Sequence, residues 1–235
     1  MHYIHYIPIL TTCFSIFFLR AIFKHYLQKK NAVYLLWWSI GVLTYGLGTL
    51  SESINTLYGW SDLNFRFWYI VGALLGGFPL AQGTVYLLFK KRTADILSII
   101  VVSVVFIASM CVLLSPVDPS LIENGRLSGK ALGWQWVRAF SPFINTYAFI
   151  FLFGGAIYSA FQYRKLTASD KRFLGNIFIA IGSLLPGIGG TFTRFGYVEV
   201  LYVTELLGLV SIYYGYNIIK KDPTVSVHSI QTVAS

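Results

Sequence analysis

Seven long apolar segments constrain the fold of this 235-residue sequence more than any other feature. A helix needs about 20 mostly apolar residues to cross a bilayer. Segments of that kind cover residues 3–25, 32–54, 66–89, 94–115, 141–163, 172–192 and 197–219. Only 11% of the residues are charged, whereas soluble domains average about a quarter. The sequence therefore predicts an all-α bundle of seven transmembrane helices, a multi-pass protein of the cell membrane.

The basic residues predict the orientation of these spans. Thirteen of the 18 Lys and Arg residues lie near or beyond the C-terminal ends of spans one, three, five and seven. Because cytoplasmic loops carry an excess of Lys and Arg, we expect the N-terminus outside and the C-terminus in the cytoplasm. Anionic lipid headgroups account for the net charge of +9, so the lipid bilayer is the expected partner and nucleic acid is not.

The domain organisation predicted is one transmembrane domain over residues 1–221. Within it, residues 40–52 (IGVLTYGLGTLSE) match residues 181–194 (IGSLLPGIGGTFTR) with one insertion. This suggests parallel repeats at 1–90 and 141–221, a known transporter plan, although apolar sequences rich in Gly and Leu also match by chance. Helix 94–115 and an external loop, 116–140, would link the repeats, and 222–235 would form a disordered cytoplasmic tail after the helix-stopping Pro223.

Carboxylates inside the spans are the unusual feature, because a charge costs about 2.5–3.5 kcal/mol at the centre of a span. In the proposed repeat, Glu52 aligns with Arg194 and Arg66 with Glu199. The sequence thus predicts two structural ion pairs, Glu52–Arg194 and Arg66–Glu199, between the repeats.

Glu205 lies deeper in span seven and is the strongest candidate for function. It follows Glu199 by six residues, which places the two about 120° apart on a helix and excludes a shared-face dyad. Its expected neighbours are uncharged, and they complete a predicted ligand-binding set of Glu205, Tyr45, Gln82, Thr49 and Asn145. The alternative is a structural carboxyl that is protonated and hydrogen-bonded to a neighbour.

Glycine and proline predict irregular or closely packed helices. Gly76–Pro79 in span three and Pro186–Gly190 in span six predict either a broken helix that lines a cavity or a kink that shapes the bundle. Small residues four apart, as in Gly72/Gly76, Gly155/Ser159 and Ser211/Gly215, predict close helix packing. Residues 132–140, LGWQWVRAF, predict a short element at the membrane interface.

Motifs for catalysis and cofactors are missing from the sequence. No nucleophile elbow, zinc-protease helix or phosphate loop is present. His2 and His5 alone are weak grounds for a metal site, and Cys13 and Cys111 lie in apolar runs as core residues would. We therefore expect no cofactor, no metal and no catalytic residue, while enzyme activity stays open.

Two stretches carry a resemblance to a known group of proteins: residues 72–97, GALLGGFPLAQGTVYLLFKKRTADIL, and residues 175–216, GNIFIAIGSLLPGIGGTFTRFGYVEVLYVTELLGLVSIYYGY. VDP at 117–119 and SPFINT at 141–146 fit it as well. The chain resembles an uncharacterised group of prokaryotic seven-span membrane proteins. That group has no known activity, so the resemblance implies no functional residue.

The function predicted is the binding of a small amphiphile or lipid in an outward-facing cavity among the helices. The protein would act as a sensor or accessory component, with a membrane protein as a further partner. The alternatives are a small-molecule or proton-coupled transporter with Glu205 as the protonatable site, and a membrane enzyme acting on lipid. Binding is favoured over transport because the inner halves of the spans are apolar and aromatic, whereas transport paths have polar linings.

Overall fold

The computed structural model describes residues 3–29, 31–122, 125–167, 170–193 and 195–222. Seven helices in it are long and apolar enough to cross a membrane. They are Tyr3–Gln28, Val33–Tyr58, Asp62–Leu88, Lys91–Leu114, Gln135–Lys165, Asp170–Thr193 and Val198–Lys220. The expected all-α architecture with seven spans is confirmed, and the protein is a polytopic membrane protein by this criterion. Its orientation stays a prediction.

The chain forms two compact units, unit 1 (Met1–Ala148) and unit 2 (Phe149–Ser235). The boundary falls inside span five, within the stretch predicted as the second repeat. Nothing in the architecture supports the internal repeat: span three is interrupted, while its expected counterpart, span seven, is one continuous helix.

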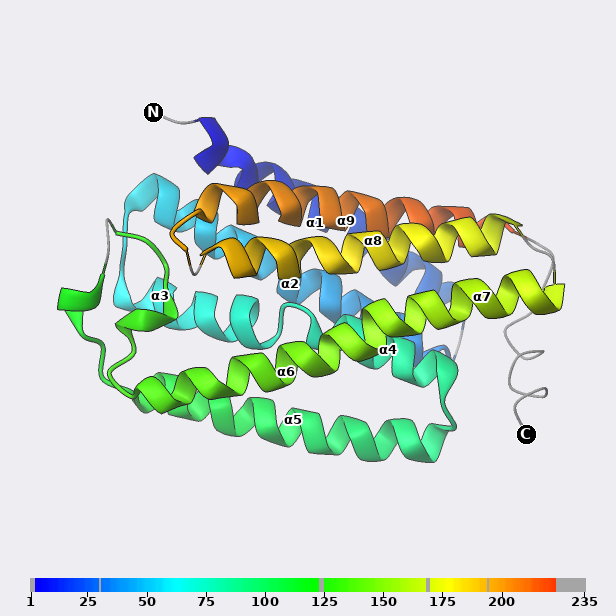
Figure 1. Cartoon of the computed structure of the whole chain (residues 1–235), viewed down its shortest axis with the longest axis horizontal. Helices are drawn as coiled ribbons and strands as arrows, with labels where there is room; N and C mark the ends of the chain where they lie inside the picture. The colour runs from blue at the N-terminus through cyan, green and yellow to red at the C-terminus, as the bar shows by residue number, and fades with distance from the viewer. Residues whose placement is uncertain (1–2, 30, 123–124, 168–169, 194, 223–235) are drawn as a thin grey trace. The chain divides into compact units, whose positions relative to one another are not determined.

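Unit 1 is organised around α2 (Val33–Tyr58), which packs against α1 (Ile7–Gln28), α3 (Asp62–Trp68) and α4 (Phe78–Leu88). Two further helices, α5 (Lys91–Leu114) and α6 (Phe140–Ala148), contact α4 and each other (Figure 1). Glycines in α2 permit this crowding. A Cβ on Gly48 would lie 3.2 Å from the Cα of Gly72, so larger residues would push α2 away from span three.

Span three changes its helical geometry twice. It begins as α3, continues as a π-helical segment (Tyr69–Leu74), loses helical structure at residues 75–77, and resumes as α4. Gly76, Gly77 and Pro79 explain the interruption, because proline lacks an N–H and glycine weakens a helix. The structure thus shows a break here, one of the two alternatives, and whether the break lines a cavity stays a prediction. Span six differs, since α8 (Asp170–Thr193) continues through Pro186 without interruption.

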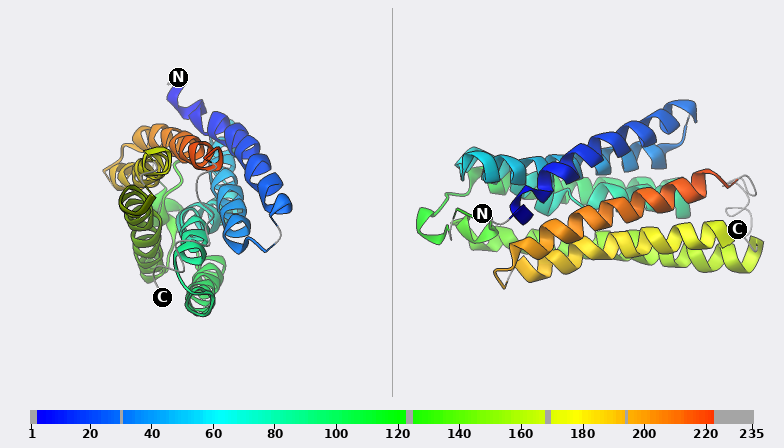
Figure 2. Two further views of the ribbon diagram at one scale, coloured as in Figure 1. Left: turned by 90° about the vertical axis from the view of Figure 1, so that its right-hand side faces the viewer. Right: turned by 90° about the horizontal axis from the view of Figure 1, so that it is seen from above.

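Unit 2 comprises a π-helical segment (Phe149–Gly154), α7 (Gly155–Thr167), α8 and α9 (Val198–Lys220). Figure 2 shows α8 and α9 side by side along their lengths, and α7 also packs on α8. Glycines allow this approach: a Cβ on Gly182 would lie 2.5 Å from the carbonyl oxygen of Gly208, and Gly175 and Gly215 face each other in the same way one heptad along. The packing role predicted for Gly215 is confirmed.

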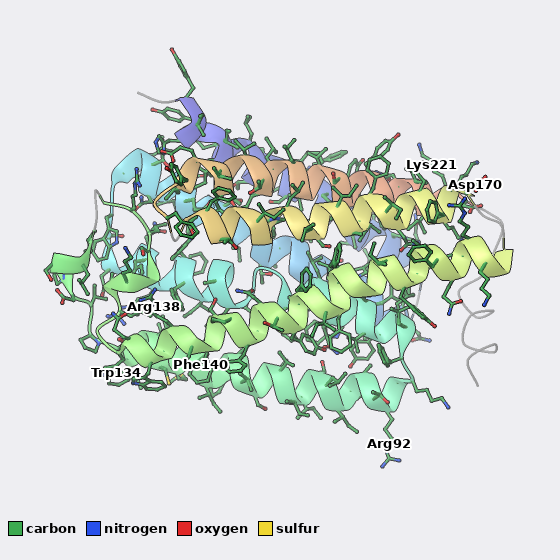
Figure 3. All side chains as sticks on the ribbon, in the orientation of Figure 1. Arg92, Trp134, Arg138, Phe140, Asp170 and Lys221 are labelled. Carbon is green, nitrogen blue, oxygen red and sulfur yellow. The ribbon has the colours of Figure 1, made fainter. Side chains whose placement is uncertain are left out.

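The long loop between α5 and α6 is folded onto unit 1. An isolated bridge joins Val117 to Leu132, and both Leu132 and Val137 are fully buried. The indoles of Trp134 and Trp136 stack with their centroids 6.1 Å apart, beside a 3-10 turn (Gln135–Ala139) that leads into α6. Figure 3 shows Trp134 and Arg138 near Phe140 at the start of α6. A short element thus exists where LGWQWVRAF predicted one.

Candidate functional site

The interruption in span three leaves carbonyl groups without helical partners, and neighbouring helices supply the donors. The hydroxyl of Thr44 on α2 lies 3.1 Å from the carbonyl oxygen of Leu75 and equally far from that of Gly41 in its own helix, so its one hydrogen can be donated to either oxygen. The Ser141 hydroxyl donates to the carbonyl oxygen of Ala73 at 3.2 Å, and the Asn145 side-chain amide donates to the same oxygen at 3.4 Å. Freed backbone groups at membrane depth must be satisfied, so these side chains explain how unit 1 tolerates the break.

Gln82, predicted to contact a ligand, has both ends of its amide occupied. It is fully buried in α4. Its Nε2 donates to the carbonyl oxygen of Ala94 at 3.0 Å, and its Oε1 accepts from the hydroxyl of Tyr147 at 2.6 Å. Gln82 therefore connects α4 with the start of α5 and with α6.

Thr49 and Tyr45 lie on α2, where both are buried. The Thr49 hydroxyl lies 2.9 Å from that of Thr12 on α1 and donates to the carbonyl oxygen of Gly46 at 3.1 Å. Asn145, by contrast, is exposed and also donates to Ser141. The described hydrogen bonds do not join these residues to one another, and their role in ligand binding stays a prediction.

Glu52 is a buried carboxylate near the end of α2, with 4% of its surface exposed. The indole Nε1 of Trp68 donates to its Oε1 at 3.1 Å. The partner predicted for it, Arg194, lies outside the described residues, so that ion pair stays a prediction. The sequence does not predict Trp68 as a partner of Glu52, because a contact between two helices leaves no local pattern.

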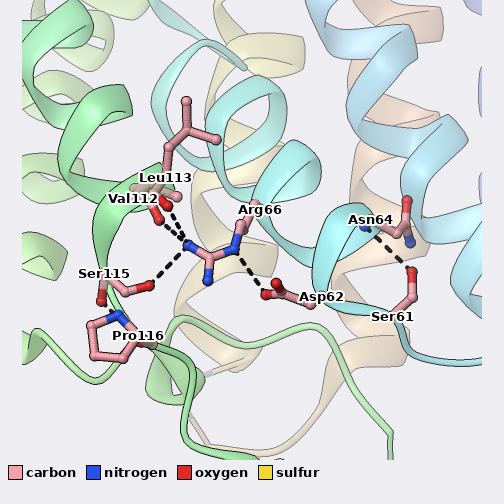
Figure 4. Close-up of polar contacts among 8 residues, drawn as sticks. All are labelled: Ser61, Asp62, Asn64, Arg66, Val112, Leu113, Ser115 and Pro116. Carbon is pink, nitrogen blue, oxygen red and sulfur yellow. Dashed lines mark hydrogen bonds and ion pairs between the residues drawn. The ribbon is translucent and has the colours of Figure 1, made fainter.

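Arg66 binds the end of α5 (Figure 4). Its Nη1 donates to the carbonyl oxygens of Val112, Leu113 and Ser115 at 2.7, 2.8 and 2.9 Å, while its Nε pairs with Asp62 at 2.8 Å. A cation at a helix C-terminus satisfies free carbonyls and complements the helix dipole. Its predicted pairing with Glu199 joins residues of different units and stays a prediction.

Glu199 and Glu205 both lie on α9 in unit 2. Glu199 belongs to the first turn, whereas Glu205 is half-buried in the middle of the helix. Glu205 and the four other predicted ligand-binding residues thus belong to different units. Glu205 remains the one carboxylate in the interior of this span.

Unit 2 contains a buried ion pair that the sequence does not predict. Arg172 at the start of α8 and Asp222 after α9 approach to 3.4 Å, with side chains 7% and 3% exposed. Arg172 also donates to the hydroxyl of Tyr163 at 3.1 Å and lies over its ring. The sequence places Asp222 in the predicted tail, because it precedes Pro223, and Arg172 among the basic residues predicted to be cytoplasmic. The rest of that tail lies outside the described residues.

Metal-binding geometry is not found in the described part of the chain, where no three His, Cys, Asp or Glu side chains group closely enough to hold an ion. His2, half of the weak pair considered from the sequence, lies outside the described residues. The arrangement as a whole offers hydrogen-bonding groups inside apolar helices. Such groups can bind or orient a ligand.

Comparison with known proteins identifies no relative: no family model matches the sequence, and no curated protein matches it significantly. The resemblance to uncharacterised seven-span proteins therefore establishes no family.

Proposed function

We propose that the protein binds a small amphiphile or lipid among its membrane-spanning helices, as a sensor or accessory component. The observation that carries this proposal is Glu205, a half-buried carboxylate in the middle of α9. Ionisable residues inside spans are costly and are kept mainly where they bind a substrate, an ion or a ligand.

The ligand expected at such a position combines an apolar body with a donor-bearing headgroup. Apolar side chains would bury the body, and the carboxyl of Glu205 would bond the headgroup. Tyr45 and Thr49 are buried on α2 of unit 1, and their part in ligand binding stays a prediction from the sequence, like that of Asn145. Gln82 is the weakest member of the set, because its amide already bonds to Ala94 and Tyr147.

Native mass spectrometry of the full-length protein in mild detergent tests this proposal. We expect the wild type to retain an amphiphile that extraction then identifies. Glu205→Gln keeps the shape of the side chain and removes its charge, and should lower occupancy about tenfold, the effect of losing one charge-assisted hydrogen bond. Glu199→Gln, on the same helix, is the matched control. The proposal fails if the wild type retains nothing or if the two variants bind equally.

A transporter is the second candidate, favoured by the interrupted span three. Discontinuous spans are typical of transporters, whose binding sites they form. The hydrogen bonds from Thr44 and Ser141 to the freed carbonyls argue against an open site there. Proteoliposomes containing a pH-sensitive dye decide between the two. Uptake of the identified amphiphile with proton flux, lost in Glu205→Gln, would indicate transport, whereas binding without flux would indicate a sensor.

A further inference from the structure

Two exposed tryptophans lie in unit 1 just before α6 begins. Trp134 and Trp136 expose 38% and 57% of their surfaces, although their indoles stack on each other. Trp136 also contacts the ring of Phe140, with centroids 6.1 Å apart, and Phe143 further along α6 is 76% exposed. We call these four side chains and Arg138 the indole patch, of which Figure 3 labels Trp134, Arg138 and Phe140.

Contacts with buried parts of unit 1 fix the backbone of the indole patch. The backbone N–H of Trp134 donates to the Ser115 hydroxyl at the end of α5, at 3.0 Å. Val137 is fully buried, and the residues on either side of it, Trp136 and Arg138, are exposed. The indoles are therefore presented at the surface by a segment that is itself attached to the core. Exposed apolar patches of this kind mark sites of contact with other molecules.

The polar groups of the indole patch are hydrogen-bond donors. An indole N–H and a guanidinium can donate but cannot accept. Arg138 uses one nitrogen, Nη1, to donate to the Gln135 side chain at 2.8 Å, and in the described part of the chain neither indole N–H donates a hydrogen bond. Residues 125–140 contain three basic residues, Arg126, Lys130 and Arg138, and no acidic residue. A partner with oxygen acceptors and negative charge is complementary to this set.

The position of the indole patch along its span favours lipid as that partner. The membrane-spanning segment Gln135–Lys165 begins beside Trp136. Trp136 contacts Phe140, and Phe143 follows three residues later on the same face of α6. The patch thus extends from two tryptophans at the end of the span to an exposed phenylalanine within it. Tryptophans are enriched at this level of a bilayer, because the ring is apolar and its N–H can bond to polar groups there.

We propose that the indole patch anchors the loop between α5 and α6 to the bilayer surface. Phe143 contacts acyl chains, the two indoles lie among the lipid ester groups, and Arg138 donates to a lipid phosphate. A soluble ligand or a partner protein is the competing occupant, but neither accounts for the continuation of the patch into the span at Phe143. The anchor goes beyond the proposed function and does not depend on Glu205.

Depth-resolved ¹⁹F spectroscopy of the full-length protein tests this inference. The protein is labelled with 5-fluorotryptophan in phosphatidylcholine nanodiscs, and Trp134→Phe and Trp136→Phe assign two of the six tryptophan signals. Three paramagnetic probes are compared: a nitroxide on the lipid headgroup, a nitroxide at the end of the acyl chain, and a soluble gadolinium chelate. We expect both signals to lose most of their intensity with the headgroup nitroxide and less with either of the other probes.

Arg138→Gln tests the phosphate contact and retains both indoles. Without the cation the loop should lie further from the lipid, so the headgroup nitroxide should broaden the two signals less and the chelate should broaden them more. Arg92→Gln is the matched control, because Arg92 is exposed at the start of α5 and outside the patch. Should a tryptophan variant fail to fold, a density map of the wild type in nanodiscs shows directly whether the two indoles contact lipid.

Four results would overturn the inference. Broadening by the chelate alone would place the indoles in water, where a soluble ligand or a partner protein is the occupant. Broadening by the chain-end nitroxide alone would place them in the hydrocarbon, and broadening by none of the probes would mean that protein covers them. Equal responses of Arg138→Gln and Arg92→Gln would exclude the phosphate contact.

Discussion

Spans three and seven differ in how their backbone hydrogen bonds are satisfied and in how they pack on neighbouring helices. Span three is broken, and its freed carbonyls accept hydrogen bonds from Thr44 on α2 and Ser141 on α6. Span seven is continuous, so its backbone is satisfied internally, and it packs closely on α8 through glycines. Inside a membrane there is little hydrophobic drive between helices, and both hydrogen bonds and close packing can replace it.

This contrast indicates which contacts stabilise each unit. In unit 1 several modest hydrogen bonds share the task, so the loss of one leaves the others. In unit 2 the backbones of α8 and α9 approach so closely that a single methyl group has no space, and one buried ion pair, Arg172–Asp222, joins α8 to the end of α9. Unit 2 should therefore respond more strongly to single substitutions.

The largest effect is expected from breaking the buried ion pair. Arg172→Met leaves Asp222 buried without its cation, which costs about 3–5 kcal/mol when one partner of such a pair is removed. Titration with SDS, followed by circular dichroism, measures the loss in free energy of unfolding. Lys171→Met is the matched control, because Lys171 is exposed.

The double variant Arg172→Met/Asp222→Leu sharpens this result. Replacing both charges by apolar groups often restores most of the stability, so the double variant should unfold later than Arg172→Met. If Arg172→Met matches its control instead, the ion pair contributes little and unit 2 depends on helix packing alone.

The next effect concerns the glycine contacts of α8 and α9. Gly182→Ala places a methyl group 2.5 Å from the Gly208 carbonyl oxygen, and overpacking of this kind costs about 1–3 kcal/mol. Gly187→Ala, on the same helix but with open space at its Cβ, should be neutral or stabilising because alanine favours helix. Equal unfolding free energies for the two variants would show that α8 and α9 are less closely packed than described.

The sequence could predict features that depend on neighbouring residues, but not those that depend on contacts between distant segments. Seven spans follow from local hydropathy, and the break in span three from Gly76, Gly77 and Pro79. Proline and glycine do not always break a helix, however: α8 continues through Pro186 and the glycines that follow it. The hydrogen bonds of Thr44, Gln82 and Arg66 depend on which helices become neighbours, and no local pattern encodes this. Pro223 places Asp222 in the predicted tail, and its pairing with Arg172, 50 residues away, leaves no local pattern in the sequence.

The smallest expected effect is the loss of one hydrogen bond at the break in span three. Thr44→Val keeps the shape of the side chain but removes the donor to Leu75, and such bonds within membranes average about 0.6 kcal/mol. Thr93→Val, at an exposed position of α5, is the control. A loss near that average would support shared stabilisation in unit 1. A loss larger than that of Gly182→Ala would reverse the comparison, because the break would then depend on this one hydroxyl, with Ser141 and Asn145 unable to compensate.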